Sequence, residues 1–200
     1  MFKHITKMAC IAGFCLAATA QAAVAQDDPF EDGWTLNPEQ STLTFQSIKN
    51  NSVVESSTFA TYSGQIGEDG TATLEVLLDS IDTKVDLRNV RMRFLFFETF
   101  QYPKATVTAR LSEAQLADLA TVRRKNMKLP FTLDLHGVSR DLVADVTVTL
   151  LSGDIVSVAT TTPLSLAVAD FNLMAGVEKL QEAANVQIVP SSSITFDFVF

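Results

Sequence analysis

Cysteine is almost absent from this 200-residue chain, and its two copies, Cys10 and Cys15, both lie within the first 25 residues. Neither follows the Leu-small-small pattern expected of a cysteine that carries a lipid. If the N-terminal region is removed, the remaining domain has no thiol with which to form a disulfide or attack a substrate. We therefore expect a domain held together by its core alone, without a lipid anchor.

The residue types of catalytic and metal sites are also scarce. His136 is the only histidine beyond residue 25, and the sequence contains no G-x-S-x-G elbow, no H-E-x-x-H motif and no glycine-rich phosphate loop. A metal site would lack ligands for the same reason. At a turn, on the polar side of its strand, His136 favours a structural hydrogen bond over catalysis. We expect no catalytic residue, no metal and no cofactor, so an enzyme is the least favoured function.

Five charged residues gather in one short segment: Asp82, Asp86, Arg88, Arg91 and Arg93. The two carboxylates could be imagined as a general acid and a general base. Beside three arginines they are more simply interpreted as a partly exposed ion-pair cluster that ties this segment to one end of the fold. The alternative is that an arginine contacts the polar head of a ligand.

What the chain does have at its start is the pattern of a secretory signal. Lys3 and Lys7 precede an apolar run that is shorter than the ~20 residues needed to span a bilayer. Of two possible cleavage sites, Ala20-Gln21-Ala22 and Ala23-Val24-Ala25, the second is favoured because polar, turn-forming residues follow it. We expect residues 1–25 to be cleaved, residues 26–33 to form a short polar leader, and residues 34–200 to fold as one periplasmic domain with no integral membrane anchor.

Acidic residues outnumber basic ones, 23 against 15, so the net charge is −8. Cleavage near Ala25 would also remove Lys3 and Lys7 and leave a net charge of −10. Nucleic acid and anionic membrane surfaces are therefore expected to be poor partners.

From Trp34 onward apolar and polar residues alternate, which places every second side chain on one face of a strand. The strand segments are 42–46, 71–78, 105–111, 127–135, 142–150, 154–168 and 193–200. Pro130 suggests an edge or a bulge, and residues 136–140 indicate a hairpin. Short helices are predicted over 113–120, where Ser112 and Gln115 form a capping box, and over 177–184. About eight antiparallel strands are expected, which suits a barrel or a sandwich.

Residues 79–103 do not alternate and are dense in arginine and phenylalanine. In order they contain Asp79-Ser80-Ile81-Asp82-Thr83, Arg88-Asn89, Arg91-Met92-Arg93, Phe96-Phe97-Glu98 and Tyr102-Pro103. Together with residues 34–38, 41–45 and 135–140, this segment resembles the YceI-like family of exported polyisoprenoid-binding proteins, and the landmarks match in order over nearly all of residues 34–200. Arg91 stands where that family usually has histidine, and Glu98 where it usually has aspartate.

The resemblance implies an all-β fold with short helical insertions: a lipocalin-like antiparallel β-barrel whose apolar interior holds an isoprenoid chain, of the quinone or polyprenyl type. An interior built from phenylalanine suits a hydrocarbon, and the chain has 14 Phe against one Trp and two Tyr. The residues expected to bind the ligand are Phe45, Phe59, Leu74, Val76, Phe94, Phe97, Phe131, Leu133 and Phe171. The implied function is a soluble periplasmic protein that sequesters or carries this or another long-chain lipid, and a homodimer is possible.

Two other functions remain open. Alternation does not say whether the apolar face points inward or toward lipid, so a transmembrane barrel of the outer membrane is one alternative, and the terminal Phe200 is typical of such barrels. The scarcity of Trp and Tyr for interfacial girdles argues against it. The other alternative is a partner-binding module with a filled core, because a fold does not fix a function.

Overall fold

The computed structural model describes residues 30–152 and 155–200. The expected signal peptide, its cleavage site at Ala25 and the first part of the leader lie outside these ranges.

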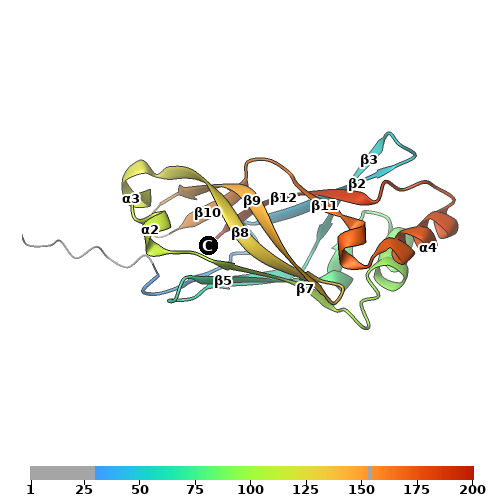
Figure 1. The fold of residues 1–200 in the computed structure, drawn as a ribbon, viewed down its shortest axis with the longest axis horizontal. Coiled ribbons are helices and arrows are strands. Elements are labelled where there is room, and N and C mark those ends of the chain that lie inside the picture. The colour runs from blue at the N-terminus through green and yellow to red at the C-terminus, as the bar shows by residue number, and fades with distance from the viewer. Residues whose placement is uncertain (1–29, 153–154) are drawn as a thin grey trace, which may run out of the picture.

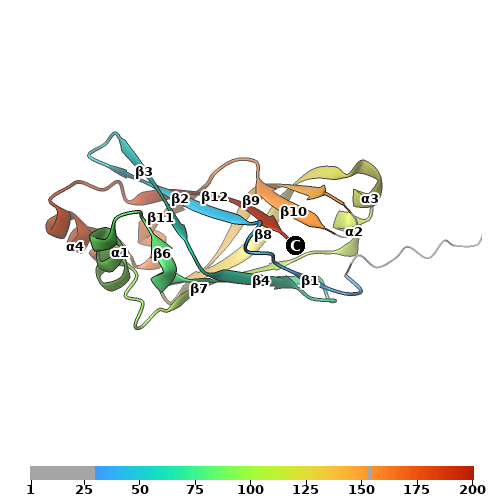
Figure 2. The same ribbon diagram turned by 180° about the vertical axis from the view of Figure 1, so that it is seen from behind.

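A single antiparallel sheet makes up most of the molecule. Its strands are β1 (Trp34–Thr35), β2 (Thr42–Lys49), β3 (Val53–Phe59), β4 (Tyr62–Ile66), β5 (Thr71–Leu77), β6 (Ile81–Asp82), β7 (Lys104–Arg110), β8 (Arg124–Leu135), β9 (Val138–Leu150), β10 (Val156–Thr160), β11 (Leu164–Ala167) and β12 (Ser191–Val199). The strand order is β1-β4-β5-β7-β8-β9-β10-β12-β2-β3-β6, and β11 also pairs with β12. Figures 1 and 2 show these strands from opposite sides.

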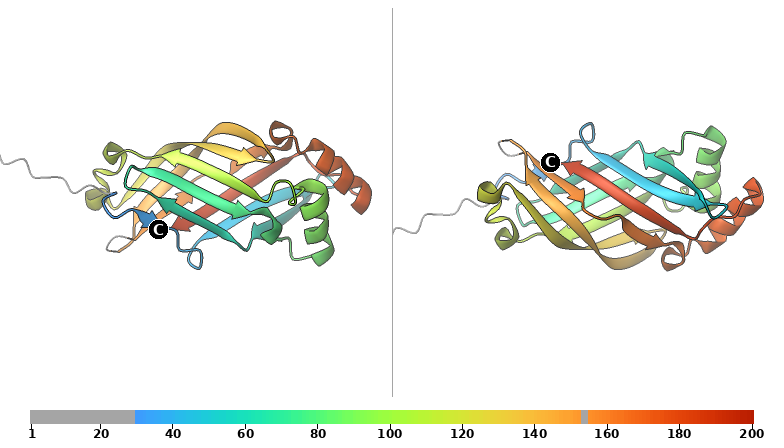
Figure 3. Two further views of the ribbon diagram at one scale, coloured as in Figure 1. Left: turned by 90° about the horizontal axis from the view of Figure 1, so that it is seen from below. Right: turned by 90° about the horizontal axis from the view of Figure 1, so that it is seen from above.

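The sheet curls until its two edges meet, which gives the long barrel seen in Figure 3. The chain turns sharply between β3 and β4, where the Ala60 N–H donates to the Ser80 carbonyl (2.9 Å) and the Leu77 N–H to the Thr61 carbonyl (3.0 Å). After β1, the Asn37 N–H donates to the Val199 carbonyl at 2.7 Å. The predicted lipocalin-like β-barrel with short helical insertions is therefore confirmed.

The helices occupy the two ends of the barrel (Figure 1). At one end lie α2 (Glu113–Leu116) and α3 (Leu119–Val122); at the other lie α1 (Asp86–Arg91), η2 (Met92–Phe96), which is a π-helix, and α4 (Met174–Ala184). Two 3₁₀ turns, η1 (Leu78–Ser80) and η3 (Val168–Phe171), complete the set. The predicted capping box of Ser112 and Gln115 is present at the start of α2, and α4 begins three residues before the predicted helix.

The observed strands differ from the prediction in number. The described residues form 12 strands rather than about eight, because β1 and β6 are only two residues long, β3 and β4 do not alternate clearly, and residues 154–168 contain two strands, β10 and β11. The β8–β9 hairpin turns at His136 and Gly137, which both have positive φ, as a tight two-residue turn requires. Pro130 lies just beyond the β7–β8 ladder, which ends at Phe131, so its strand is paired only with β9 there.

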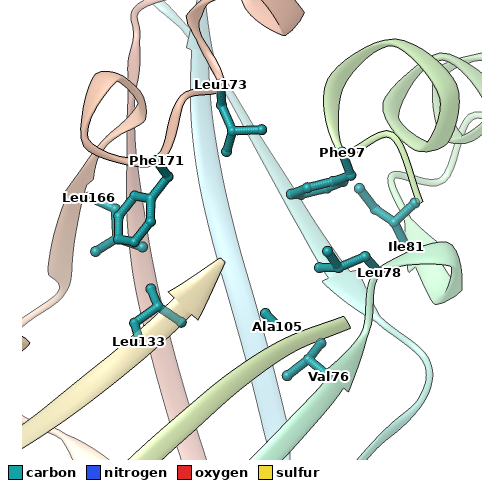
Figure 4. Close-up of a cluster of buried hydrophobic side chains, with 9 residues drawn as sticks. All are labelled: Val76, Leu78, Ile81, Phe97, Ala105, Leu133, Leu166, Phe171 and Leu173. Atoms are coloured by element: carbon teal, nitrogen blue, oxygen red, sulfur yellow. The ribbon is translucent and has the colours of Figure 1, made fainter. Parts of the chain in front are cut away.

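Two clusters of buried side chains form the core, one toward each end of the barrel. At the α1–α4 end, Phe171 lies beside Leu166, and Phe97 lies beside Ile81 and Leu78 on the other side of the cluster (Figure 4). The cluster at the α2–α3 end contains Phe30, Ile66, Leu116, Leu119, Ala144, Val146, Val148 and Val156. Phe131, in the middle of β8, packs against both.

Candidate ligand-binding cavity

An apolar cavity of about 400 Å³ lies inside the barrel. Its walls are the inward faces of the strands: on β2, for example, Leu43 and Phe45 face the cavity, whereas their neighbours Thr42 and Gln46 are exposed. The apolar face of the sheet therefore points inward. A volume of this size falls within the range of pockets that bind small ligands.

Eight of the nine predicted ligand-binding residues line this cavity: Phe45, Phe59, Leu74, Val76, Phe97, Phe131, Leu133 and Phe171. The ninth, Phe94, does not line it, and 58% of the residue is exposed. The alternating pattern correctly placed the strand residues inside. Phe94 belongs instead to the helical turn η2, where the period is not two, so its side chain faces away from the barrel.

Aromatic rings form a continuous row along one part of the wall. Phe45 lies 5.4 Å from Phe59 between ring centroids, Phe59 lies 5.9 Å from Phe97, and Phe97 lies 4.8 Å from Phe96. The row joins β2 and β3 to the end of η2. Rings with no polar atom can contact a hydrocarbon along their whole surface, and they leave no hydrogen bond unsatisfied when they do so.

The cavity lining changes from apolar to charged along β2 and β3. On β2 the inward residues run Phe45, Ser47, Lys49. On the antiparallel β3 they run Phe59, Ser57, Glu55 in the same direction, because Phe45 pairs with Ser57 and Ser47 with Glu55. The polar residues thus lie together at the α1–α4 end. Lys49 and Glu55 were not predicted from the sequence, although each lies two residues beyond an inward serine and therefore on the same face of its strand.

Four charged side chains line the cavity within the described part of the chain: Lys49, Glu55, Arg88 and Arg91. Lys49 Nζ lies 2.6 Å from Glu55 Oε1, and Arg88 forms an ion pair with the other carboxylate oxygen of Glu55. Burial acts to raise the pKa of Glu55, but the hydrogen bonds from Lys49 and Arg88 outweigh it and hold that pKa below its ordinary value. The Glu55 carboxylate thus forms ion pairs with both Lys49 and Arg88.

Arg91 differs from Arg88 because no described residue forms a hydrogen bond or ion pair with its side chain. The ion-pair cluster expected among Asp82, Asp86 and the three arginines is wrong for the described residues. Asp82 instead accepts a hydrogen bond from the Lys84 N–H, and Arg88 reaches across to Glu55 on β3. This partner lies more than 30 positions away in the sequence, so no local pattern could indicate it.

The start of α1 positions Arg88. Thr83 is buried, and its N–H and hydroxyl both donate to Asn89 Oδ1, at 2.8 and 2.6 Å. The Thr83 carbonyl in turn accepts a hydrogen bond from Arg88 Nη2 at 2.8 Å. The Nε of Arg88 is buried and has no partner among the described residues. The arginine is therefore held in place with donor capacity to spare.

The opposite end of the cavity is closed by apolar side chains. Leu116 of α2 lines the cavity and is itself buried, as is Val156 of β10. Phe30 and Leu119 pack behind them in the same cluster. In the described part of the chain no charged side chain lines this end. The exposed lining residues, Ala167 and Ala184, belong to the α1–α4 end, which places the opening there.

His136 makes the structural hydrogen bond that its turn position predicted. Its Nε2 lies 3.3 Å from Glu98 Oε2, and its ring packs against Tyr102 with 4.1 Å between centroids. Lys179 of α4 contacts the other oxygen of Glu98 at 3.2 Å. That hydrogen bond lowers the pKa of Glu98 below its ordinary value, with a smaller contribution from His136. Glu98 thus links the β8–β9 turn to α4.

Within residues 30–152 and 155–200, no group of three or more His, Cys, Asp or Glu residues is arranged to hold a metal ion. Among the helices of the same ranges, none is both long and apolar enough to cross a membrane.

Comparison with known proteins agrees with this geometry. A search of curated proteins finds no match. Among solved structures, a polyisoprenoid-binding domain from Saccharophagus degradans, implicated in plant cell wall breakdown, is 36% identical, with a TM-score of 0.79 over 82% of this chain and 95% of that one. BcnA of Burkholderia cenocepacia shares the fold at 19% identity, with a TM-score of 0.64 over 82% of this chain and 99% of that one. The model of the YceI-like domain matches residues 34–200, and this protein belongs to that family.

Proposed function

We propose that this protein is a periplasmic carrier that binds a polyisoprenoid, of the quinone or polyprenyl type, with its hydrocarbon tail in the barrel. The observation that carries the proposal is the cavity, which is apolar over most of its length and polar at one end. Burying each methylene-sized unit of such a tail contributes ~0.8 kcal/mol, so a few isoprene units suffice for useful affinity. The 36% identical domain is itself described as polyisoprenoid-binding.

The orientation of the ligand follows from the polar end. A lipid that entered with its polar head first would place that head among Leu116, Val156 and their neighbours, where it would lose its hydrogen bonds to water. With the tail inserted first, the head stays beside Arg88 and Arg91, which have unused donors. In this role the protein binds its ligand and carries out no catalytic step.

The direct test is native mass spectrometry on protein expressed as the full chain, processed by the cell and recovered from the periplasm without detergent. Organic extraction and analysis of the lipid should identify a stoichiometric isoprenoid. A clean protein mass that stays unchanged after incubation with polyprenols or quinones would contradict the proposal. Protein retained in the cytoplasm would contradict the proposed location.

A matched pair of variants tests whether the cavity holds the ligand. Ala109 is buried and lines the cavity, whereas its neighbour Thr108 is exposed on the outer face of β7. Ala109→Phe fills part of the space and should lower the bound fraction of lipid about tenfold or more, because a tail that fits tightly loses several contacts. Thr108→Phe adds the same group outside and should retain the lipid. Equal loss in both variants would argue against the cavity.

A further inference from the structure

Apolar side chains are exposed around the cavity opening, on two separate segments of the chain. We name this surface the mouth collar, and it consists of Val53, Val54, Val85, Leu87, Val90 and Phe94. The two valines begin β3, directly after the turn of the β2–β3 hairpin, and the others belong to α1, to η2 and to the residue before α1. Figures 1 and 2 show that the hairpin tip, α1 and α4 lie at the same end of the barrel.

The helical part of the collar is apolar on both of its faces. Met92 and Phe96 pack inward against the core cluster of that end. Leu87, Val90 and Phe94, spaced three and four residues apart, lie on one outer face and are 59%, 45% and 58% exposed. A surface helix of a globular protein normally presents polar residues on its outer face. An outer stripe of this kind therefore needs a partner that is apolar.

The charges between these apolar residues point to a lipid bilayer as that partner. Residues 84–93 contain Lys84, Arg88, Arg91 and Arg93 but a single acid, Asp86, although the whole chain has a net charge of −8. Arg88 is already paired with Glu55, which leaves three cations against one acid in this segment. Basic residues interleaved with exposed Leu, Val and Phe are the pattern of a segment that lies in the interface of an anionic membrane.

The overall negative charge by itself disfavours anionic membranes, but charges far from the contact are screened over about 8–10 Å at physiological ionic strength. The local excess of positive charge therefore decides the contact. A protein partner would more often present acidic groups to pair with these cations, and it serves as an outcome of the test below.

We propose that the mouth collar docks on the surface of an anionic lipid bilayer, with the cavity opening toward the membrane. A hydrocarbon tail leaving the bilayer would then pass from acyl chains to the collar and into the barrel without crossing water. The proposal extends the proposed function, and the two can fail separately, because docking is measured without a ligand in the cavity.

The experiment is flotation of the lipid-extracted protein with vesicles made of equal parts of phosphatidylcholine and phosphatidylglycerol. We expect the protein to float with these vesicles and to be released at an ionic strength of about 1 M, where charges are screened within about 3 Å. Binding should be weaker to vesicles of phosphatidylcholine alone. Protein that stays at the bottom of the gradient with both vesicles would overturn the proposal.

Paired variants locate the contact. Leu87→Gln with Phe94→Gln removes two exposed apolar groups of the collar and should reduce the vesicle-bound fraction at least about fivefold. Val143→Gln with Leu151→Gln removes two groups of similar exposure, 52% and 47%, away from the opening and should change nothing. An equal loss in both pairs would overturn the proposal. So would a dimer in analytical ultracentrifugation that only the collar pair dissociates, without vesicle binding, because the collar would then face a second copy of this chain.

Discussion

The two ends of the barrel both carry large apolar residues, but one end buries them and the other exposes them. At the α2–α3 end, Leu116 and Leu119 are turned inward against Phe30 and close the cavity. At the α1–α4 end, Leu87 and Phe94 are turned outward while Arg88 and Arg91 face the cavity. Burial stabilises the first end, whereas the second end keeps apolar groups in water. An exposed apolar surface that does not stabilise the fold is expected where a protein binds something.

The largest effect is expected at Phe131, which packs against the core clusters of both ends. Phe131→Asp places a carboxylate in the apolar middle of the barrel and should lower the free energy of unfolding by about 3–5 kcal/mol. Lipid uptake should be lost as well. Urea unfolding measures the first effect and lipid extraction the second. Phe131→Leu, which keeps an apolar side chain, should retain most of both. Unchanged stability in the aspartate variant would mean that this face of β8 does not point inward.

Truncating Leu116, which closes the α2–α3 end, should lower the free energy of unfolding more than any change at the α1–α4 end. Leu116→Ala should cost about 2–4 kcal/mol, because it deletes a buried side chain and enlarges the cavity. Leu151→Ala, at an exposed position, should stay within about 0.5 kcal/mol of the unmodified protein. Thermal unfolding of the two variants side by side measures the difference. Equal small losses would show that the α2–α3 end is not a packed closure.

At the open end the expected effect is on binding rather than on folding. Arg91 has no partner in the described ranges, so Arg91→Gln should change the free energy of unfolding by less than about 0.5 kcal/mol. Affinity for a lipid with a polar head should fall about tenfold, because the variant loses one charge-assisted hydrogen bond to that head. Arg110→Gln, an exposed arginine on β7, removes the same charge elsewhere. Isothermal titration with one isoprenoid and both variants tests the prediction, which fails if the two variants bind alike.

The smallest expected effect is a pH dependence at Glu55. Its pKa is lower in the folded state than in the unfolded one, so its ion pairs stabilise the fold above the unfolded value and are lost as the pH falls through the folded pKa. Glu55→Gln should therefore cost roughly 1 kcal/mol at neutral pH and nothing once the pH lies below the folded pKa of Glu55. Melting curves of the two proteins from neutral to acidic pH should converge. Parallel curves would contradict the prediction.

The sequence predicted the inside of the barrel better than its opening. Phe45 and Phe131 line the cavity, as alternation suggests, because side chains two residues apart on a strand share one face. Lys49 and Glu55 escaped attention because charged residues are usually exposed, although they continue the face that begins at Phe45 and Phe59. The partner of Arg88 depends on how β3 and α1 meet in space, and no local pattern carries that information.

The contrast between the ends has a consequence for kinetics. With α2 closing one end, the described part of the barrel opens only at the α1–α4 end, so a ligand bound as proposed would leave by the path it entered. Transfer between two membranes then requires the loaded protein to detach, diffuse and turn its entrance to the second membrane. The transfer rate should therefore depend on the concentration of acceptor membrane only when encounter is slow. When tail withdrawal is slow, it should depend on chain length.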